Sequence, residues 1–458
     1  MSYVLVQRSS GSTLNLESGY PTCKFIYVTI CTRIFMELAS ASGYIRPGHV
    51  ASRGVAGLRF GRMQIGQPHC KPNGRCSILS FSELVGVARY QTIVHDGDIT
   101  IAKVRVRAVL PPLPKPLQTA SGQLTHASIL LIDLEMSSGA VGVSYLFSPR
   151  QDMLKPMIEI IHALVASVTG LPCDPVAICE QFDRQFLLFG GTGVVTMARA
   201  AIDMAMWDTI AKHHGEPLYR LLGGTSEPIK AYESSGLGLS NAAQVAEEAV
   251  SFVNNGFDTM KVRLGYPEIR DDELVLDAVR SAVGDHIGLM VDYNQALTFE
   301  QALDRCSALE RFHLLWIEEP LHAADLEGAA KIAHQVNTPI QLGENLFSQH
   351  EVERAISLGS SKYLMPDVMK IGGATDWLVA ATRADQNGIP ISSHLFPEIS
   401  AHLLACAPNR HFLEYVNWTD AILVEPVKPR NGHVTIPDHP GIGLSWNEKA
   451  VAQFQLPT

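Results

Sequence analysis

Strand-like and helix-like segments alternate eight times after Pro228, and this alternation constrains the fold more than any other feature of the chain. Short apolar runs are separated by stretches with helical spacing, which is typical of parallel strands joined by crossover helices. Eight such units within about 190 residues favour a closed α/β barrel of the TIM type over an open doubly wound sheet. The predicted strands are 229–234, 259–264, 288–293, 314–318, 339–343, 363–365, 389–393 and 412–415.

The residues before the barrel have the mixed pattern of a compact α+β domain, which we place at 98–226. The barrel itself is predicted over 227–423, and a proline-rich segment, 424–458, is expected to fold back on the α+β domain. Within the α+β domain we predict strands at 99–109, 129–134 and 141–147, a proline-rich loop at 111–128, and helices at 153–168 and 194–213.

Residues 1–97 differ from the rest because they show no sustained helical or strand periodicity. They are interpreted as a poorly ordered leader that packs little against the barrel, with a small extra domain as the alternative. Their most apolar stretch, 25–36, is interrupted by Arg33 and is too short to span a bilayer. It also lacks a nearby small-residue cleavage site, so it makes a poor signal peptide.

Charge and cysteine usage exclude several classes of function. The formal net charge of −10 argues against nucleic-acid binding, which needs a basic face. The eight cysteines contain no CxxC pair, so neither a zinc ribbon nor a disulfide framework is indicated. We therefore expect a cytoplasmic protein that acts on a small molecule, without a membrane or nucleic-acid partner.

Charged residues stand at the ends of the predicted barrel strands, close to one for each strand-helix unit. The carboxyl ends of barrel strands meet around one mouth, so these side chains are expected to converge on a single cavity. The series consists of Lys261, Arg263, Asp292, Glu318, Glu344, Asp367, His394 and Glu414.

Asp292, Glu318 and Glu344 end three successive strands, and they are the candidate metal ligands. Three carboxylates cannot share a dry pocket unless a cation compensates their charge. Oxygen ligands alone favour a hard ion, Mg²⁺ before Mn²⁺.

Asp367 and His394 end adjacent strands, which lets the carboxylate accept a hydrogen bond from one ring nitrogen and turn the other toward the cavity. His394 is therefore a candidate general base. Lys261 and Arg263 are two residues apart on one strand, so both point inward and can neutralise a substrate carboxylate. Glu414 lies on the last strand, where a protonated form would donate a hydrogen bond to the same carboxylate.

The motifs around these residues resemble the mandelate racemase subgroup of the enolase superfamily over roughly residues 99–450. They are MKVRLGYP, VDYNQ, WIEEP, GEN, MPDVMKIGG, SSHLF and FLEY. The resemblance implies a modified (β/α)7β barrel, capped by the α+β domain with loop 111–128 as the substrate lid. It also implies a homo-oligomer, from dimer to octamer, and an enolate stabilised by Mg²⁺.

By the same resemblance, the Mg²⁺ ligands are Asp292, Glu318 and Glu344. Lys261 and Glu414 polarise the substrate carboxylate, and His394 with Asp367 is the base. Ser234 and Asn294 occupy positions that contact the substrate's hydroxyl or carboxylate.

One departure from the family pattern bears on the reaction, because Arg263 stands where the racemase motif has a second lysine. A guanidinium is a poor base, which questions two-base racemisation and favours dehydration of an acid sugar by His394 alone. The predicted apolar wall of the substrate pocket argues instead for racemisation. The hydroxyls of an acid sugar would lack hydrogen-bond partners there, which costs binding free energy. We weigh a racemase or epimerase of 2-hydroxycarboxylates first and an aldonate or aldarate dehydratase second. The residues expected to form the wall are Leu117, Leu124, Phe147, Leu395 and Val416.

Overall fold

The computed structural model describes residues 93–94 and 99–457. The chain divides into two units, Met1–Cys76 and Ser77–Thr458, and the described residues all belong to the second. The predicted leader therefore lies outside the described residues, except for Ile93 and Val94. Ile93 is buried, and its carbonyl accepts a hydrogen bond from His214 Nε2 at 2.9 Å.

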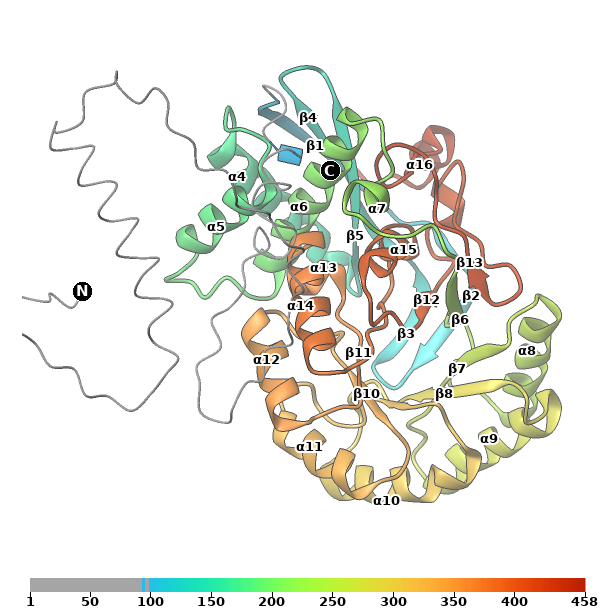
Figure 1. Ribbon diagram of the computed structural model, residues 1–458. Coiled ribbons are helices and arrows are strands. Elements are labelled where there is room, and N and C mark those ends of the chain that lie inside the picture. The colour runs from blue at the N-terminus through green and yellow to red at the C-terminus, as the bar shows by residue number, and fades with distance from the viewer. Residues whose placement is uncertain (1–92, 95–98, 458) are drawn as a thin grey trace, which may run out of the picture. The chain divides into compact units, whose positions relative to one another are not determined.

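The carboxyl-terminal part of the second unit is a parallel barrel whose strands follow the order β11-β10-β9-β8-β7-β6-β12 (Figure 1). Parallel bridges join Ile391 to Leu364 of β11 and to Arg410 before β12, so this residue links the two ends of the sheet. The predicted strand 389–393 is thus reduced to isolated bridges, because it pairs too briefly to form a ladder. The strands are β6 (Ile229–Glu233), β7 (Thr259–Arg263), β8 (Gly288–Asp292), β9 (Ile317–Glu318), β10 (Ile340–Leu342), β11 (Tyr363–Leu364) and β12 (Leu413–Tyr415).

Seven strand-to-strand connections contain helices, and together with the eighth strand they make the predicted (β/α)7β arrangement. Side-chain caps begin several of these helices, as at Asn241, Asp325 and Ser348. Thr298 and Gln301 form a capping box. The helices are α8 (Ala242–Asn254), α9 (Ile269–Val283), α10 (Phe299–Ala308), α11 (Leu326–Gln335), α12 (Gln349–Leu358), α13 (Val368–Ile371) with α14 (Ala374–Gln386), and α15 (Pro397–Cys406). Short 3-10 turns follow α10 at Leu309–Phe312 and β12 at Asp420–Ile422.

Strand β7 shows how the sequence separates the core from the site. Side chains alternate along a strand, so Met260 and Val262 pack in the layer between sheet and helices. Lys261 and Arg263 consequently point into the barrel, where they are 1 % and 5 % exposed.

The amino-terminal part of this unit is an antiparallel sheet covered by helices. The sheet order is β1-β4-β5, and β1 pairs with β4 in a long ladder. Helix α5 begins at an Asp174 cap followed by Pro175, a start signal that the sequence analysis missed. The elements are β1 (Ile101–Val109), β4 (Ser128–Met136), β5 (Val141–Ser148), a 3-10 turn (Gln151–Met153), α4 (Leu154–Val168), α5 (Pro175–Gln185), α6 (Val194–His213) and α7 (Leu218–Leu221).

The carboxyl-terminal segment contains β13 (His433–Val434) and α16 (Glu448–Phe454). β13 pairs with β6 of the barrel. Beyond it, the chain returns to β1, where Leu110 N donates to Phe454 O at 2.9 Å and Leu456 N donates to Ala108 O at 2.9 Å. None of the helices within residues 93–94 and 99–457 has the length and apolarity needed to cross a membrane.

The segment predicted as a proline-rich loop is instead a hairpin of β2 (Pro112–Thr119) and β3 (Gly122–His126). The prediction was wrong because proline is tolerated in an edge strand, where an N–H facing outward needs no partner. The hairpin contacts the loops after two barrel strands, since Leu239 N donates to Gln118 O at 2.7 Å and Ser121 Oγ donates to Asn294 O at 3.3 Å. It therefore covers the mouth of the barrel.

Helix α6 is joined to the barrel at the turn between α13 and α14. Arg199 pairs with Asp376, and Asp203 accepts a hydrogen bond from Thr375 N at 3.1 Å. Gly372 and Gly373 have φ of 115° and 113°, and a Cβ on either would collide with these α6 side chains. This close approach fixes the turn that follows Asp367.

Candidate active site

Asp292, Glu318 and Glu344 form a cluster at the carboxyl ends of β8, β9 and the loop after β10. Each offers one oxygen, and these three atoms lie within 4.8 Å of one another. Burial and the neighbouring carboxylates raise the pKa of Glu318 to about 8, although Lys261 opposes the shift. Donors that are all carboxylate oxygens fit a hard divalent cation, so the cluster can hold a metal ion.

Lys261 lies between the cluster and Glu414. Its Nζ is 2.6 Å from Glu318 Oε1, 2.7 Å from Glu414 Oε1 and 3.4 Å from Asp292 Oδ2. Burial alone would lower the pKa of this lysine, but the surrounding carboxylates outweigh it and raise the pKa above the usual value. Lys261 is therefore a fixed positive charge.

Glu414 is an acceptor in each of its contacts. Oε1 accepts from Ser234 Oγ at 2.7 Å and Oε2 accepts from Leu395 N at 2.9 Å. Burial raises the pKa of Glu414, but Lys261, His394 and Arg263 outweigh it and lower the pKa to about 2. The protonated form considered from the sequence is not the one that this geometry stabilises.

His394 and Asp367 meet as expected for adjacent strand ends. His394 Nδ1 is 2.6 Å from Asp367 Oδ2, and Nε2 is 3.1 Å from Glu344 Oε2. Burial lowers the pKa of His394, but the carboxylates of Glu344, Glu414 and Asp367 outweigh it and raise the pKa well above its usual value. Leu395 and Phe396, both with φ of 49°, turn the chain sharply after the histidine.

Arg263 is held on both sides of its guanidinium. Nη1 is 2.5 Å from Asp292 Oδ2, and Nη2 donates to Ser234 Oγ at 2.9 Å. The pKa of Arg263 is raised, because Asp292 and the other carboxylates outweigh the effect of burial. The group thus holds a carboxylate of the acidic cluster, and it does not readily release a proton.

The four residues predicted to contact substrate have different surroundings. Ser234 is fully buried, with its hydroxyl between Arg263 and Glu414. Asn294 donates to Asp292, and its Oδ1 is buried without a hydrogen-bond partner among the described residues. Leu117 and Leu124 are cross-strand neighbours in the hairpin, and Leu117 packs beside Gly238.

A small apolar cavity adjoins the His394 turn. It lies between the antiparallel sheet and the loops after the last two barrel strands, and Leu395 belongs both to it and to the contact with Glu414. Three of the five predicted apolar-wall residues line it, whereas Leu117 and Leu124 do not. Its lining is Ile129, Tyr145, Phe147, Leu395, Phe396, Val416, Trp418 and Thr419.

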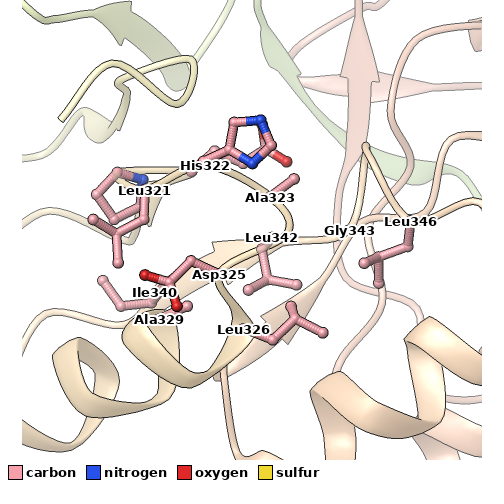
Figure 2. Close-up of a pocket in the computed structure, with 12 residues that line it drawn as sticks. Leu321, His322, Ala323, Asp325, Leu326, Ala329, Ile340, Leu342, Gly343 and Leu346 are labelled. Atoms are coloured by element: carbon pink, nitrogen blue, oxygen red, sulfur yellow. The ribbon is translucent and has the colours of Figure 1, made fainter. Parts of the chain in front are cut away.

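Sequence reasoning missed three polar residues next to the cluster: Glu319, Asn345 and Lys370. Glu319 and Asn345 directly follow Glu318 and Glu344 of the acidic cluster, so the motifs WIEEP and GEN contained the signal. Glu319 also borders an apolar cavity of about 20 Å³ between β10 and α11 (Figure 2). In that view the side chains of Leu342 and Leu326 lie next to each other, and both line the cavity.

Comparison with known proteins identifies the family of this chain. A family model described as Enolase C-terminal domain-like matches residues 244–450, and the Mandelate racemase / muconate lactonizing enzyme, N-terminal domain matches residues 101–223. The chain belongs to the mandelate racemase group of the enolase superfamily. It is therefore an enzyme of a group that contains both isomerases and lyases, and its fold is the modified TIM barrel.

Several relatives of this superfamily enzyme cover most of the described residues. It is 33 % identical to the L-talarate/galactarate dehydratase of Salmonella typhimurium, over 81 % of this chain and 94 % of the relative. It is 29 % identical to a hydrophobic dipeptide epimerase of Enterococcus faecalis, over 68 % and 88 %. A Bradyrhizobium enolase crystallised with magnesium and mandelic acid is 38 % identical, with a TM-score of 0.76 over 79 % of this chain and 100 % of that one.

Proposed function

We propose that this enzyme removes the α-proton of a small 2-hydroxycarboxylate with His394 as its single base, and that it dehydrates a 2,3-dihydroxy acid. The observation that carries the proposal is the double anchoring of Arg263 by Asp292 and Ser234. A guanidinium held in this way cannot serve as the second base that two-face proton exchange requires. The coarse chemistry, proton abstraction next to a carboxylate, is supported by the relatives of both reaction types.

Asp292, Glu318 and Glu344 would hold one Mg²⁺, the ion named for the Bradyrhizobium neighbour. When bound, the ion neutralises the substrate carboxylate and the charge that grows on it as the α-proton leaves. Lys261 adds a fixed positive charge on the same side, because its ammonium lies within 2.7 Å of both Glu318 and Glu414.

His394 takes the α-proton on Nε2. Asp367 accepts the hydrogen bond from Nδ1–H, which orients the ring so that Nε2 points into the site, where it lies 3.1 Å from Glu344 Oε2. In the dehydration, the C–H electron pair becomes the new double bond and the C3–O bond breaks. The imidazolium returns its proton to the departing hydroxyl, so water leaves and the enol becomes a 2-keto acid.

Asn294 is the residue best suited to recognise a substrate hydroxyl. Its amide nitrogen is engaged by Asp292, whereas its buried Oδ1 lacks a partner among the described residues. An unpaired buried acceptor is costly, so a substrate O–H that reaches it would be bound selectively.

Racemisation or epimerisation is the second candidate, and the apolar cavity favours it. Phe147, Leu395 and Val416 line this cavity next to the His394 turn. An aromatic or branched substituent suits such a wall better than a polyhydroxy chain does. The mandelic acid in the Bradyrhizobium neighbour is consistent with such a substituent.

One screen separates the candidates. Mono- and dihydroxycarboxylates are incubated with the enzyme and Mg²⁺ in D₂O, and 2-keto acid formation and deuterium incorporation are followed by NMR. Dehydration yields keto acid, with deuterium on one face of any recovered substrate. Labelled antipode without keto acid would reject the dehydratase and support the racemase.

A further inference from the structure

Asn345 connects a metal-cluster carboxylate to two charged residues that the proposed reaction does not use. Its Nδ2 lies 3.0 Å from Glu344 Oε1 and 3.0 and 2.8 Å from the two oxygens of Glu319. Its Oδ1 accepts a hydrogen bond from Lys370 Nζ at 2.7 Å. An ammonium has no acceptor and a carboxylate no donor, so the amide can adopt only this orientation.

Glu344 lacks the support that the other two cluster residues receive from Lys261. Its oxygens instead face opposite partners, Oε2 toward His394 Nε2 at 3.1 Å and Oε1 toward Asn345, with Lys370 3.8 Å away. Without the hydrogen bond from Asn345 to Oε1, the Glu344 carboxylate is free to turn fully toward the His394 imidazole. That turn would weaken a metal ligand and occupy the base.

We propose that Asn345, oriented by Glu319 and Lys370, is a positioning residue that keeps Glu344 aimed at the cation and prevents it from turning fully toward His394. The inference rests on the proposed Mg²⁺ site. Glu319 supplies the second acceptor that holds the amide's donor side, and it is buried at 3 % exposure, so water does not compete for this hydrogen bond. Loss of an outer partner of this kind typically costs about 10- to 100-fold in metal affinity.

The test is calorimetric titration of the whole protein with Mg²⁺ alone. Asn345→Leu keeps the side-chain size and removes both hydrogen-bonding ends, and we expect its Mg²⁺ affinity to fall about 10- to 100-fold. Lys370→Met removes the hydrogen bond to the amide oxygen of Asn345 and should also lower the Mg²⁺ affinity. At saturating Mg²⁺, the kcat of both variants should recover, because the base itself is intact.

Asn409→Leu is the matched control. Asn409 is another half-buried barrel asparagine whose amide donates to Ile389 O at 2.7 Å, away from the cluster. It should lower the melting temperature and leave the Mg²⁺ affinity unchanged. Equal affinities in Asn345→Leu and the wild type would overturn the positioning role. A wild-type protein that binds no Mg²⁺ would instead overturn the proposed function.

If Asn345→Leu does not fold, Asn345→Asp keeps the size and the oxygen that faces Lys370. It replaces the donating Nδ2 with a second carboxylate oxygen, which repels the carboxylates of Glu344 and Glu319. We expect its Mg²⁺ affinity to fall as well, whereas wild-type affinity in this variant would reject the proposal.

Discussion

Asp367 holds His394 with one carboxylate oxygen and caps helix α13 with the other. Oδ2 is 2.6 Å from His394 Nδ1, and Oδ1 accepts from Met369 N at 2.7 Å and Lys370 N at 3.0 Å. The orientation of the base therefore depends on where a helix begins.

Substitutions of Asp367 can separate its effect on the helix from its effect on His394. Asparagine caps helices well, so Asp367→Asn should keep the melting temperature while turnover falls about 10²- to 10⁴-fold, because the amide cannot fix the basic tautomer. Asp367→Ala should lose turnover and the cap together. Wild-type kcat in Asp367→Asn would show that the reaction does not depend on the hydrogen bond between Asp367 and His394.

Arg263→Lys distinguishes one-base from two-base chemistry. A lysine reaches Asp292 but loses the contact with Ser234, and an ammonium gives up a proton more readily than a guanidinium does. We expect unchanged Mg²⁺ affinity and a rise in racemisation relative to one-face exchange, measured by NMR in D₂O. Loss of all turnover with unchanged metal affinity would assign the guanidinium a specific role in the reaction.

Mg²⁺ should stabilise the folded enzyme through the acidic cluster. At about 100 times its Kd, an ion that binds only the native state adds about 2.7 kcal/mol to the free energy of unfolding. Glu318→Gln should abolish the Mg²⁺-dependent rise in melting temperature, and a chelator should abolish turnover. Glu327→Gln, on an exposed helix surface, serves as the control. A Glu318→Gln protein that responds like the wild type would reject this ligand.

His402 should make the protein less stable in acid. Burial lowers the pKa of this histidine from 6.5 to about 4, and its Nδ1 accepts a hydrogen bond from Tyr219 N. Because the native state keeps His402 neutral, its contribution to the free energy of unfolding is fully present above pH 6.5. This contribution is lost as the pH falls from 6.5 toward 4. The loss is about 3 kcal/mol.

The measurement compares urea unfolding of the wild type and His402→Asn at pH 7 and pH 4.5. Asparagine offers an amide oxygen where Nδ1 lies and does not titrate. The variant should therefore lose less stability between the two pH values than the wild type does. Equal losses in the two proteins would show that His402 is not buried as a neutral group.

The barrel and the convergence of its charged residues could be predicted from the amino-acid sequence alone. One strand-helix unit follows another at a nearly constant interval, and the carboxyl ends of parallel strands share one mouth. The positions of Asp292, Glu318 and Glu344, and the pairing of Asp367 with His394, follow from that periodicity. Inward-facing lysine and arginine on β7 follow from strand alternation.

The contacts that these groups make could not be predicted without the folded structure. The two anchors of Arg263, the contacts of Asn345 with Glu319 and Lys370, and the hydrogen bond from Ser234 to Glu414 join residues 25 or more positions apart in the chain. The hairpin over the mouth also depends on contacts with loops of the barrel, which no local pattern of prolines encodes. Strand periodicity specifies which face a side chain occupies, whereas hydrogen-bond partners and pKa shifts arise from distances and burial that exist only after the barrel closes.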